Sequence, residues 1–185
     1  MPFVSRAGQK LDHALAHFGI DVAGLACADL GCNAGGFTDC LLQRGAAKVY
    51  AVDTGYGMLD WKLRKDPRVV VMERTNAMHA QLPERAGLVV IDVAWTKQRH
   101  ILPAARRMLA RDGAVVTLIK PHYEAPAGLL VRGVLPPERV AEVVQAVSRE
   151  IFAAGLDVIG TVPSPIEGQK GNKEILAYLR PIQAL

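Results

Sequence analysis

Two charged residues follow two strongly apolar stretches of the sequence. The run 87–91 ends in Asp92, and the run 114–119 ends in Lys120. Apolar runs of this length, bounded by turn residues, indicate buried strands of a parallel sheet. A lysine at the end of a buried strand is uncommon, because a buried lysine needs a partner or loses its proton. We therefore interpret Asp92 and Lys120 as candidate catalytic groups.

A glycine-rich turn lies between an expected strand at 26–30, which contains Asp29, and an expected helix at 37–42. The turn reads Gly31-Cys32-Asn33-Ala34-Gly35-Gly36. Such a turn lets backbone N–H groups and a helix N-terminus approach a ligand closely. A dinucleotide site needs G-x-G-x-x-G, and Asn33 stands where the second glycine would admit the pyrophosphate. The turn suits a ligand without phosphate, such as S-adenosylmethionine, although an ordinary α/β turn is the alternative.

Two more polar residues follow the next expected strands. Asp53 ends the apolar run 48–52, where a carboxylate can accept both ribose hydroxyls of an adenosine. Asn76 follows the strand expected at 68–72, whose carboxyl end we expect beside the glycine turn. Its amide can contact an adenine edge, and a turn asparagine is the alternative.

Strands and helices alternate along the chain. Strands are expected at 26–30, 48–52, 68–72, 87–92, 114–120, 156–162 and 173–179, and the longer helices at 37–42, 98–110 and 138–154. Alternation predicts an α/β, Rossmann-like fold with a mostly parallel seven-stranded sheet and helices on both faces. The last two strands have no helix between them, so the final strand is expected to be antiparallel.

A further helix is expected near the N-terminus, with Ser5 as its N-cap. Its apolar face carries three residues at helical spacing: Leu11, Leu15 and Phe18. Arg6 and Lys10 lie one turn apart on another face. The ordinary interpretation of that pair is a solvated basic face.

Composition limits the class of protein. At 185 residues with 50% hydrophobic residues, we expect one globular domain over residues 1–185. No apolar run approaches the roughly 20 residues of a bilayer-spanning helix, and no signal peptide is evident. These features predict a cytoplasmic protein without membrane contact. The net charge of +4 permits a phosphate-bearing partner.

The chain contains three cysteines, Cys27, Cys32 and Cys40, and no CxxC pair. Their placement in an expected strand, turn and helix predicts buried reduced thiols, and no metal site is expected.

Eight motifs, between about residue 4 and residue 180, are more specific together than the turn alone. They occupy residues 5–11, 29–31, 35–46, 50–57, 66–70, 73–76, 120–121 and 171–174. With these motifs the chain resembles the methyltransferase domain of TlyA-like proteins, within the FtsJ-type RNA 2′-O-ribose methyltransferases. The resemblance implies a class I S-adenosylmethionine-dependent fold, S-adenosyl-L-methionine as cofactor, and 2′-O-methylation of ribose in ribosomal RNA.

That family uses a Lys-Asp-Lys-Glu tetrad, which the resemblance places on Lys10, Asp92, Lys120 and Glu174. A ribose 2′-hydroxyl is too weak an acid to ionise at neutral pH, whereas the sulfonium donor is already activated and needs no metal. Our hypothesis is that Lys120 steers or deprotonates the hydroxyl and Asp92 orients it, while Lys10 and Glu174 position the ribose. The expected cofactor-binding residues are Asp29, Gly31, Cys32, Asn33, Gly35, Gly36, Phe37, Asp53, Thr54, Asn76, Ala77 and Asp92.

The sequence departs from the family in two places. TlyA-like proteins usually carry an N-terminal RNA-binding module of the S4 type, whereas Met1 lies directly before the motif at 5–11, so we expect the methyltransferase domain without it. The segment 93–97, Val-Ala-Trp-Thr-Lys, matches neither the Ser-Phe-rich TlyA pattern nor the Pro-containing FtsJ pattern. It also lacks the Asn/Asp-Pro-Pro-aromatic signature of enzymes that methylate exocyclic amines. The target nucleotide, the RNA and the oligomeric state therefore stay open.

Two other classes compete with an RNA methyltransferase. Asn33 and the antiparallel ending argue against a nucleotide-dependent oxidoreductase. A non-catalytic, degenerate methyltransferase fold that binds RNA is the other, and TlyA-like proteins are also described as haemolysins. All four tetrad positions are occupied, and no amphipathic or apolar segment supports membrane insertion.

Overall fold

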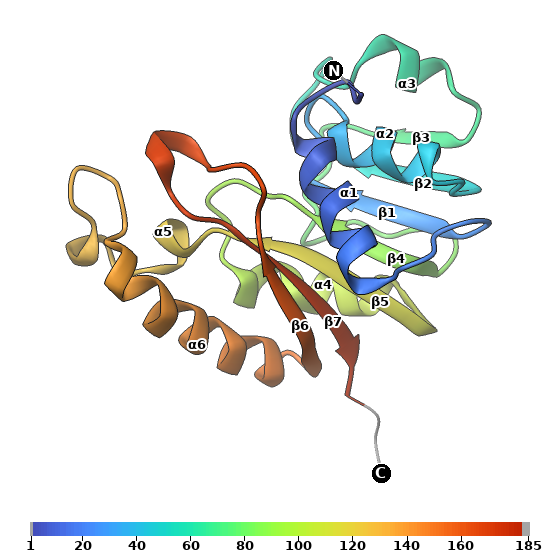
Figure 1. Ribbon diagram of the computed structural model, residues 1–185. Coiled ribbons are helices and arrows are strands. Elements are labelled where there is room, and N and C mark those ends of the chain that lie inside the picture. The colour runs from blue at the N-terminus through green and yellow to red at the C-terminus, as the bar shows by residue number, and fades with distance from the viewer. Residues whose placement is uncertain (1, 183–185) are drawn as a thin grey trace.

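A computed structural model describes residues 2–182 as a central sheet between two layers of helices (Figure 1). The strands are β1 Ala26–Leu30, β2 Lys48–Val52, β3 Val69–Met72, β4 Ala86–Ile91, β5 Leu109–Ile119, β6 Leu156–Pro163 and β7 Ile175–Pro181. Their order is β3-β2-β1-β4-β5-β7-β6. The first five strands are parallel, and β7 is antiparallel to both β5 and β6. The structure confirms the predicted mostly parallel seven-stranded sheet with an antiparallel ending.

Helices cover both faces of the sheet. The helices are α1 Ala7–Phe18, α2 Gly36–Gln43, α3 Trp61–Lys65, α4 Gln98–Met108, α5 Pro121–Glu124 and α6 Pro137–Ala153, with 3₁₀ turns at Ala127–Leu129 and Gln169–Gly171. Residues of α1, α2 and α3 share one apolar core with one face of the sheet, and residues of α4 and α6 share a second core with the other face. No described helix is long and apolar enough to cross a bilayer.

The two cores explain why the central strands are apolar without alternation. In β1, Cys27 belongs to the core under α1 and α2, whereas Ala28 belongs to the core over α4. In β4, Val89 and Val90 point to opposite faces and both are fully buried. A strand covered on both sides needs apolar residues at successive positions, because neither face meets water. Asp92 follows β4 and Lys120 follows β5, which places both residues at the carboxyl edge of the parallel strands.

Two local expectations are wrong. The helix expected to reach Ala110 ends at Met108, and β5 begins at Leu109, which pairs with Ala86 of β4. Ser5 is not the N-cap of α1, which begins at Ala7 after Arg6 with no side-chain cap. The Ser5 side chain instead packs beside the start of α2, since a Cβ added at Gly36 would lie 2.3 Å from its Oγ.

The position of β3 also differs from expectation. We expected its end to lie beside the glycine turn, whereas β3 pairs only with β2. The loop after β3 nevertheless returns to the carboxyl end of β2, because Arg74 N donates to Gly55 O and Thr75 N donates to Asp53 O. Arg74 has a positive φ of 51°, which turns the chain back at this point. Asn76 therefore lies near the end of β2.

The three cysteines are free and buried, which confirms the prediction of buried reduced thiols. Burial raises the pKa of Cys27 and Cys40 to about 12 and raises the pKa of Cys32 as well. Thiols with such pKa values stay protonated at neutral pH and are unreactive.

Candidate active site

Two cavities of 370 and 350 Å³ lie side by side at the carboxyl edge of the parallel strands. The larger, here called the β5 cavity, is lined among others by Lys10, Lys120 and Glu174. The smaller, here called the β2 cavity, is lined among others by Asp53 and Asn76. Four residues line both cavities: Gly31, Asn33, Asp92 and Ala94. The cavities therefore form one cleft, in agreement with the rule that ligands of open α/β sheets bind outside the carboxyl ends of the strands.

The glycine turn brings the ends of β1 and β4 into contact. Gly31 has a φ of 89°, and a Cβ there would lie 2.6 Å from the backbone oxygen of Asp92. Only glycine permits this conformation and this approach. Asn33 also has a positive φ, of 48°, and lines the junction of the two cavities. The first glycine of the predicted motif thus fixes Asp92 beside the turn.

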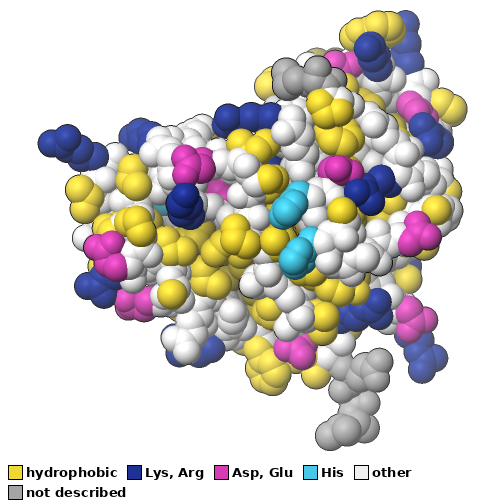
Figure 2. Space-filling view, in the orientation of Figure 1, with side chains coloured by type: hydrophobic (Ala, Val, Ile, Leu, Met, Phe, Trp, Pro, Cys, Tyr) yellow, Lys and Arg dark blue, Asp and Glu magenta, His cyan; other side chains and the backbone are white. Residues whose placement is uncertain are grey.

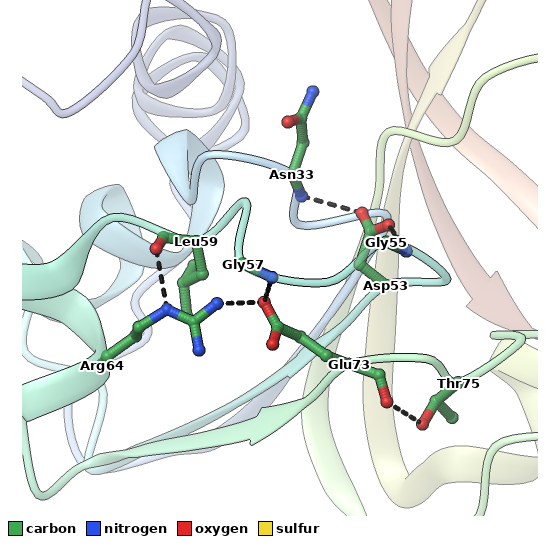
Figure 3. Close-up of polar contacts among 8 residues, drawn as sticks. All are labelled: Asn33, Asp53, Gly55, Gly57, Leu59, Arg64, Glu73 and Thr75. Carbon is green, nitrogen blue, oxygen red and sulfur yellow. Dashed lines mark hydrogen bonds and ion pairs between the residues drawn. The ribbon is translucent and has the colours of Figure 1, made fainter.

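In the β2 cavity, two backbone N–H groups hold the side chain of Asp53. The Asp53 carboxylate accepts hydrogen bonds from Asn33 N at 2.9 Å and from Gly55 N at 2.7 Å. Figure 3 shows this carboxylate between the two backbone nitrogens, with the Asn33 side chain pointing away. Each carboxylate oxygen has a second lone pair, so both can still accept a ligand hydroxyl. Asp53 and its neighbour Thr54 therefore stay candidates for a ribose.

A second network, not predicted from the sequence, shapes the loop over this cavity. Glu73 pairs with Arg64 and accepts a hydrogen bond from Gly57 N at 2.8 Å, while Arg64 Nε donates to Leu59 O at 3.0 Å (Figure 3). The Arg64 guanidinium lowers the pKa of Glu73, which stays ionised at neutral pH. These contacts fix the loop that carries Met58, and Met58 lines the cavity.

Asp29 is a buried carboxylate with one unused oxygen. It is 0% exposed, and its Oδ2 accepts a hydrogen bond from Thr38 Oγ1 at 2.7 Å. Its Oδ1 is buried without a hydrogen-bond partner among residues 2–182. Burial, with the nearby Asp92 and Asp53 carboxylates, raises the pKa of Asp29 to about 7. Because Asp29 lines the β5 cavity, its free oxygen is suited to a cationic group of a ligand.

The β5 cavity contains two ion pairs. Lys120 Nζ lies 2.6 Å from Asp92 Oδ1 and also donates to Val93 O at 3.1 Å. Lys10 Nζ lies 2.5 Å from Glu174 Oε2, although these residues are 164 positions apart. The structure thus brings together all four residues that the resemblance selected.

The prediction that Lys10 lies on a solvated basic face of α1 is wrong. Lys10 is 7% exposed and Glu174 is 6% exposed. The reason is tertiary: α1 packs beside β7, and the turn before β7 places Glu174 over the helix. Arg6, one turn earlier, is exposed at the rim of the same cavity.

The other predicted cofactor residues divide into two groups. Ten line the cleft: Asp29, Gly31, Cys32, Asn33, Phe37, Asp53, Thr54, Asn76, Ala77 and Asp92. Gly35 and Gly36 line neither cavity, because they pack against Leu63 and Ser5. The Asn76 side chain also accepts from Met78 N at 3.0 Å, so the turn role and a place in the cavity occur together.

Several cleft residues were missed by the sequence analysis. Trp95 lines the β2 cavity, is 79% exposed and has a positive φ of 51°. His122 and Tyr123 line the β5 cavity directly after Lys120, and Gly168 and Gln169 line it from the turn before β7. The last four residues could have been found from the sequence, because they lie within six positions of Lys120 or Glu174.

The fold is that of the class I S-adenosylmethionine-dependent methyltransferases. A crystal structure of such an enzyme from Mesorhizobium loti shares the fold with a TM-score of 0.68 at 18% identity, covering 91% of this chain and 96% of that one. Residues 3–180 match the FtsJ-like methyltransferase family, and the chain belongs to that family.

Two relatives share this family. The 16S/23S rRNA (cytidine-2′-O)-methyltransferase TlyA of Mycobacterium tuberculosis is 45% identical over 184 residues, which are 96% of this chain and 68% of that protein. A structure from Streptococcus thermophilus, named for a candidate hemolysin, is 38% identical with a TM-score of 0.96 and covers 100% of this chain and 69% of that chain.

The cofactor of this methyltransferase is S-adenosylmethionine, and the cleft residues fit it. The unpartnered Asp29 oxygen is suited to the cationic methionine part, and Asp53 is suited to the ribose. The β2 cavity beside Asn76 and Ala77 has room for an adenine.

Proposed function

We propose that the chain methylates the 2′-oxygen of a ribose in ribosomal RNA. The observation that carries the proposal is the position of the Lys120–Asp92 pair, since Asp92 lines both cavities and Lys120 lies 2.6 Å from it. A methyl donor with its adenosine in the β2 cavity and its cationic part beside Asp29 would meet an RNA ribose in the β5 cavity next to this pair. The Lys10–Glu174 pair lies in the same cavity as the ribose.

Donor binding uses the residues around the glycine turn. Asp53 accepts the ribose hydroxyls of the donor, Asn76 faces its adenine, and Asp29 balances its positive charge. When bound, the donor supplies a methyl group on a sulfonium, which needs no metal for activation. The turn excludes a diphosphate in this arrangement, because the Asn33 backbone is committed to Asp53.

Acceptor activation uses the tetrad. Lys120 either accepts the 2′-hydroxyl proton as a neutral amine and becomes the ammonium that Asp92 and Val93 O hold, or steers the hydroxyl as an ammonium throughout. Lys10 and Glu174, which line the same cavity, bind the ribose. Correct placement of the oxygen, about 3–3.5 Å from the methyl carbon, supplies much of the rate increase in reactions of this kind.

RNA as the substrate is supported by the relative's name and by the surface. The relative that is 45% identical is named an rRNA (cytidine-2′-O)-methyltransferase. Lys and Arg side chains are spread over the face seen in Figure 2 rather than gathered in one patch, and some lie beside hydrophobic side chains over α3. In α3, Lys65 lies 4.6 Å from the centre of the Trp61 ring, and Trp61 is 61% exposed. Exposed aromatic rings beside cations suit stacking on unpaired bases.

Trp95 is a second exposed aromatic residue, at the rim of the β2 cavity. An indole there has space to stack on a base that has been turned out of its helix. Because ribosomal RNA is transcribed and assembled in the cytoplasm, we infer that the protein works there.

The test is methyl transfer from a radiolabelled donor to total bacterial RNA. A 2′-O-methyl group protects the next phosphodiester from alkali, because alkaline cleavage requires a free 2′-hydroxyl. We expect the label in alkali-resistant dinucleotides. Label in single nucleosides with methylated bases would overturn ribose methylation. Donor binding without any transfer to RNA would instead support the non-catalytic alternative.

A further inference from the structure

His122 is a buried titratable residue that the tetrad does not include. It lies in α5, two residues after Lys120, and its side chain lines the β5 cavity. It is 7% exposed, so it is more than nine-tenths buried. Its Nδ1 has no hydrogen-bond partner among residues 2–182.

An unpaired buried nitrogen is costly. A neutral imidazole has one N–H donor and one nitrogen acceptor, and a buried group left unpaired costs about 1–3 kcal/mol. Such a residue in a cavity wall therefore indicates a ligand group that completes the hydrogen bond. The chain itself does not supply one within the described residues.

The surroundings of the ring define the partner. Burial lowers the pKa of His122, the Lys120 ammonium acts in the same direction, and the Glu174 carboxylate opposes both. The ring is therefore neutral at pH 7. The Tyr123 ring lies beside it, with centroids 4.1 Å apart, and limits its rotation. Lys10, paired with Glu174, lines the same cavity.

A neutral imidazole discriminates between the polar groups of RNA. A phosphate only accepts hydrogen bonds and would favour the charged ring, whereas a sugar hydroxyl both donates and accepts. We propose that His122 binds a ribose hydroxyl of the RNA strand in the β5 cavity. This inference depends on the proposed RNA methyltransferase activity.

The test compares His122→Ala and His122→Gln in methylation of total bacterial ribosomal RNA at saturating donor. The alanine variant is expected to lower kcat/KM for RNA about tenfold, which corresponds to one lost hydrogen bond. The glutamine variant is expected to recover most of that loss, because its amide donates and accepts. Both variants should bind S-adenosylmethionine within about twofold of the unaltered protein.

The matched control is His100→Ala, because His100 is exposed on α4 and lines neither cavity. It should leave kcat/KM unchanged. A glutamine variant as weak as the alanine variant, or a parallel loss of donor affinity, would overturn the role of His122. Inactivity of the unaltered protein on RNA would count against the proposed function, whereas an unchanged kcat/KM in His122→Ala would count only against this inference.

A pH comparison separates a hydroxyl from a phosphate. Glu174, Lys120, Tyr123 and Lys10 are present in both proteins, so the ratio of kcat/KM between the unaltered protein and His122→Gln isolates the imidazole. With a hydroxyl partner the ratio stays within about twofold from pH 8 to pH 5.5, because a hydroxyl can donate to the neutral ring and accept from the charged ring. A ratio that rises at low pH would indicate a phosphate and overturn the assignment.

Discussion

The two halves of the cleft are constructed in opposite ways. In the β2 cavity, the Asp53 carboxylate is fixed by the backbone N–H groups of Asn33 and Gly55, in the loops that follow β1 and β2. In the β5 cavity, two lysines are fixed by two carboxylates, and one pair joins residues 164 positions apart. In the first half, backbone groups close to Asp53 hold the functional carboxylate. The second half forms only when α1, β4, β5 and β7 are all in place.

This difference predicts how each half responds to substitution. Removing a carboxylate that accepts hydrogen bonds from backbone N–H groups loosens a turn and weakens the binding of one ligand. Removing one member of a buried ion pair leaves the other charge without its partner, which is more costly than losing the pair as a whole. The β5 cavity should therefore be the more sensitive half in catalysis, and the β2 cavity the more sensitive half in donor affinity.

The largest expected effect is that of Lys120→Ala. It should lower kcat for RNA methylation by about 10³-fold, because it removes the only described side chain in an ion pair with Asp92, the one we propose to steer or deprotonate the 2′-hydroxyl. The dissociation constant of the donor should change by less than about threefold. Rapid-quench kinetics and calorimetry measure the two quantities separately.

Two further variants sharpen this result. Lys120→Arg keeps the positive charge but stays protonated, so recovery of activity by arginine would assign Lys120 to steering rather than to proton removal. Lys48→Ala is the control, because Lys48 forms an exposed ion pair with Glu84 away from the cleft. Near-normal methyl transfer by Lys120→Ala would remove the mechanism proposed above.

The same contrast explains what the sequence could predict. The glycine turn, Asp53 and the strand ends were predictable, because each depends on a few neighbouring residues and on the rule that parallel strands end at one edge. Strand and helix positions agree with expectation to within a few residues for this reason. The early start of β5 at Leu109 was missed, because its pairing with Ala86 depends on a distant strand.

The Lys10–Glu174 pair of the β5 cavity was predictable only through the resemblance. By its own pattern, Lys10 belongs to a solvated helical face, and nothing local to it indicates Glu174. The pairing arises because β7 lies between β5 and β6 in the sheet. Glu174, the residue before β7, is thereby placed beside Lys10 of α1. Such an arrangement is a property of topology, which helical or strand periodicity does not contain.

The second largest effect is expected from Glu174→Ala. It should lower kcat/KM for RNA about 10²-fold and the free energy of unfolding by about 3 kcal/mol, since Lys10 is left charged and buried. Adding Lys10→Met should restore most of the stability but not the activity. Chemical denaturation and RNA methylation test the two parts.

The control for this pair is Glu142→Ala, which removes an exposed ion pair with Arg139. It should change the free energy of unfolding by less than about 0.5 kcal/mol. If the Glu174→Ala protein were as stable as this control, the Lys10–Glu174 contact would be no more than a surface ion pair.

A smaller effect is expected in the β2 cavity from Asp53→Ala. It should weaken donor binding about 30-fold while kcat at saturating donor changes less than about threefold, because Asp53 lies away from the reacting oxygen. Asp21→Ala is matched to it, since Asp21 also accepts from a backbone N–H in a turn but lines neither the β2 nor the β5 cavity. A large fall in kcat with unchanged donor affinity would reverse the division between the two halves.

The smallest expected effect concerns Asp29. This residue lines the β5 cavity but is proposed to balance the charge of the donor, whose adenosine lies in the β2 cavity. Its pKa of about 7 means that the carboxyl is protonated below neutrality in the free protein. It must then lose a proton to balance the cationic donor, so donor affinity rises with pH up to about 7 and levels off above. Between pH 8 and pH 6 we expect a loss of affinity of at most about tenfold. Calorimetry on the unaltered protein and Asp29→Asn measures it, and an equal pH dependence in both would show that another group titrates.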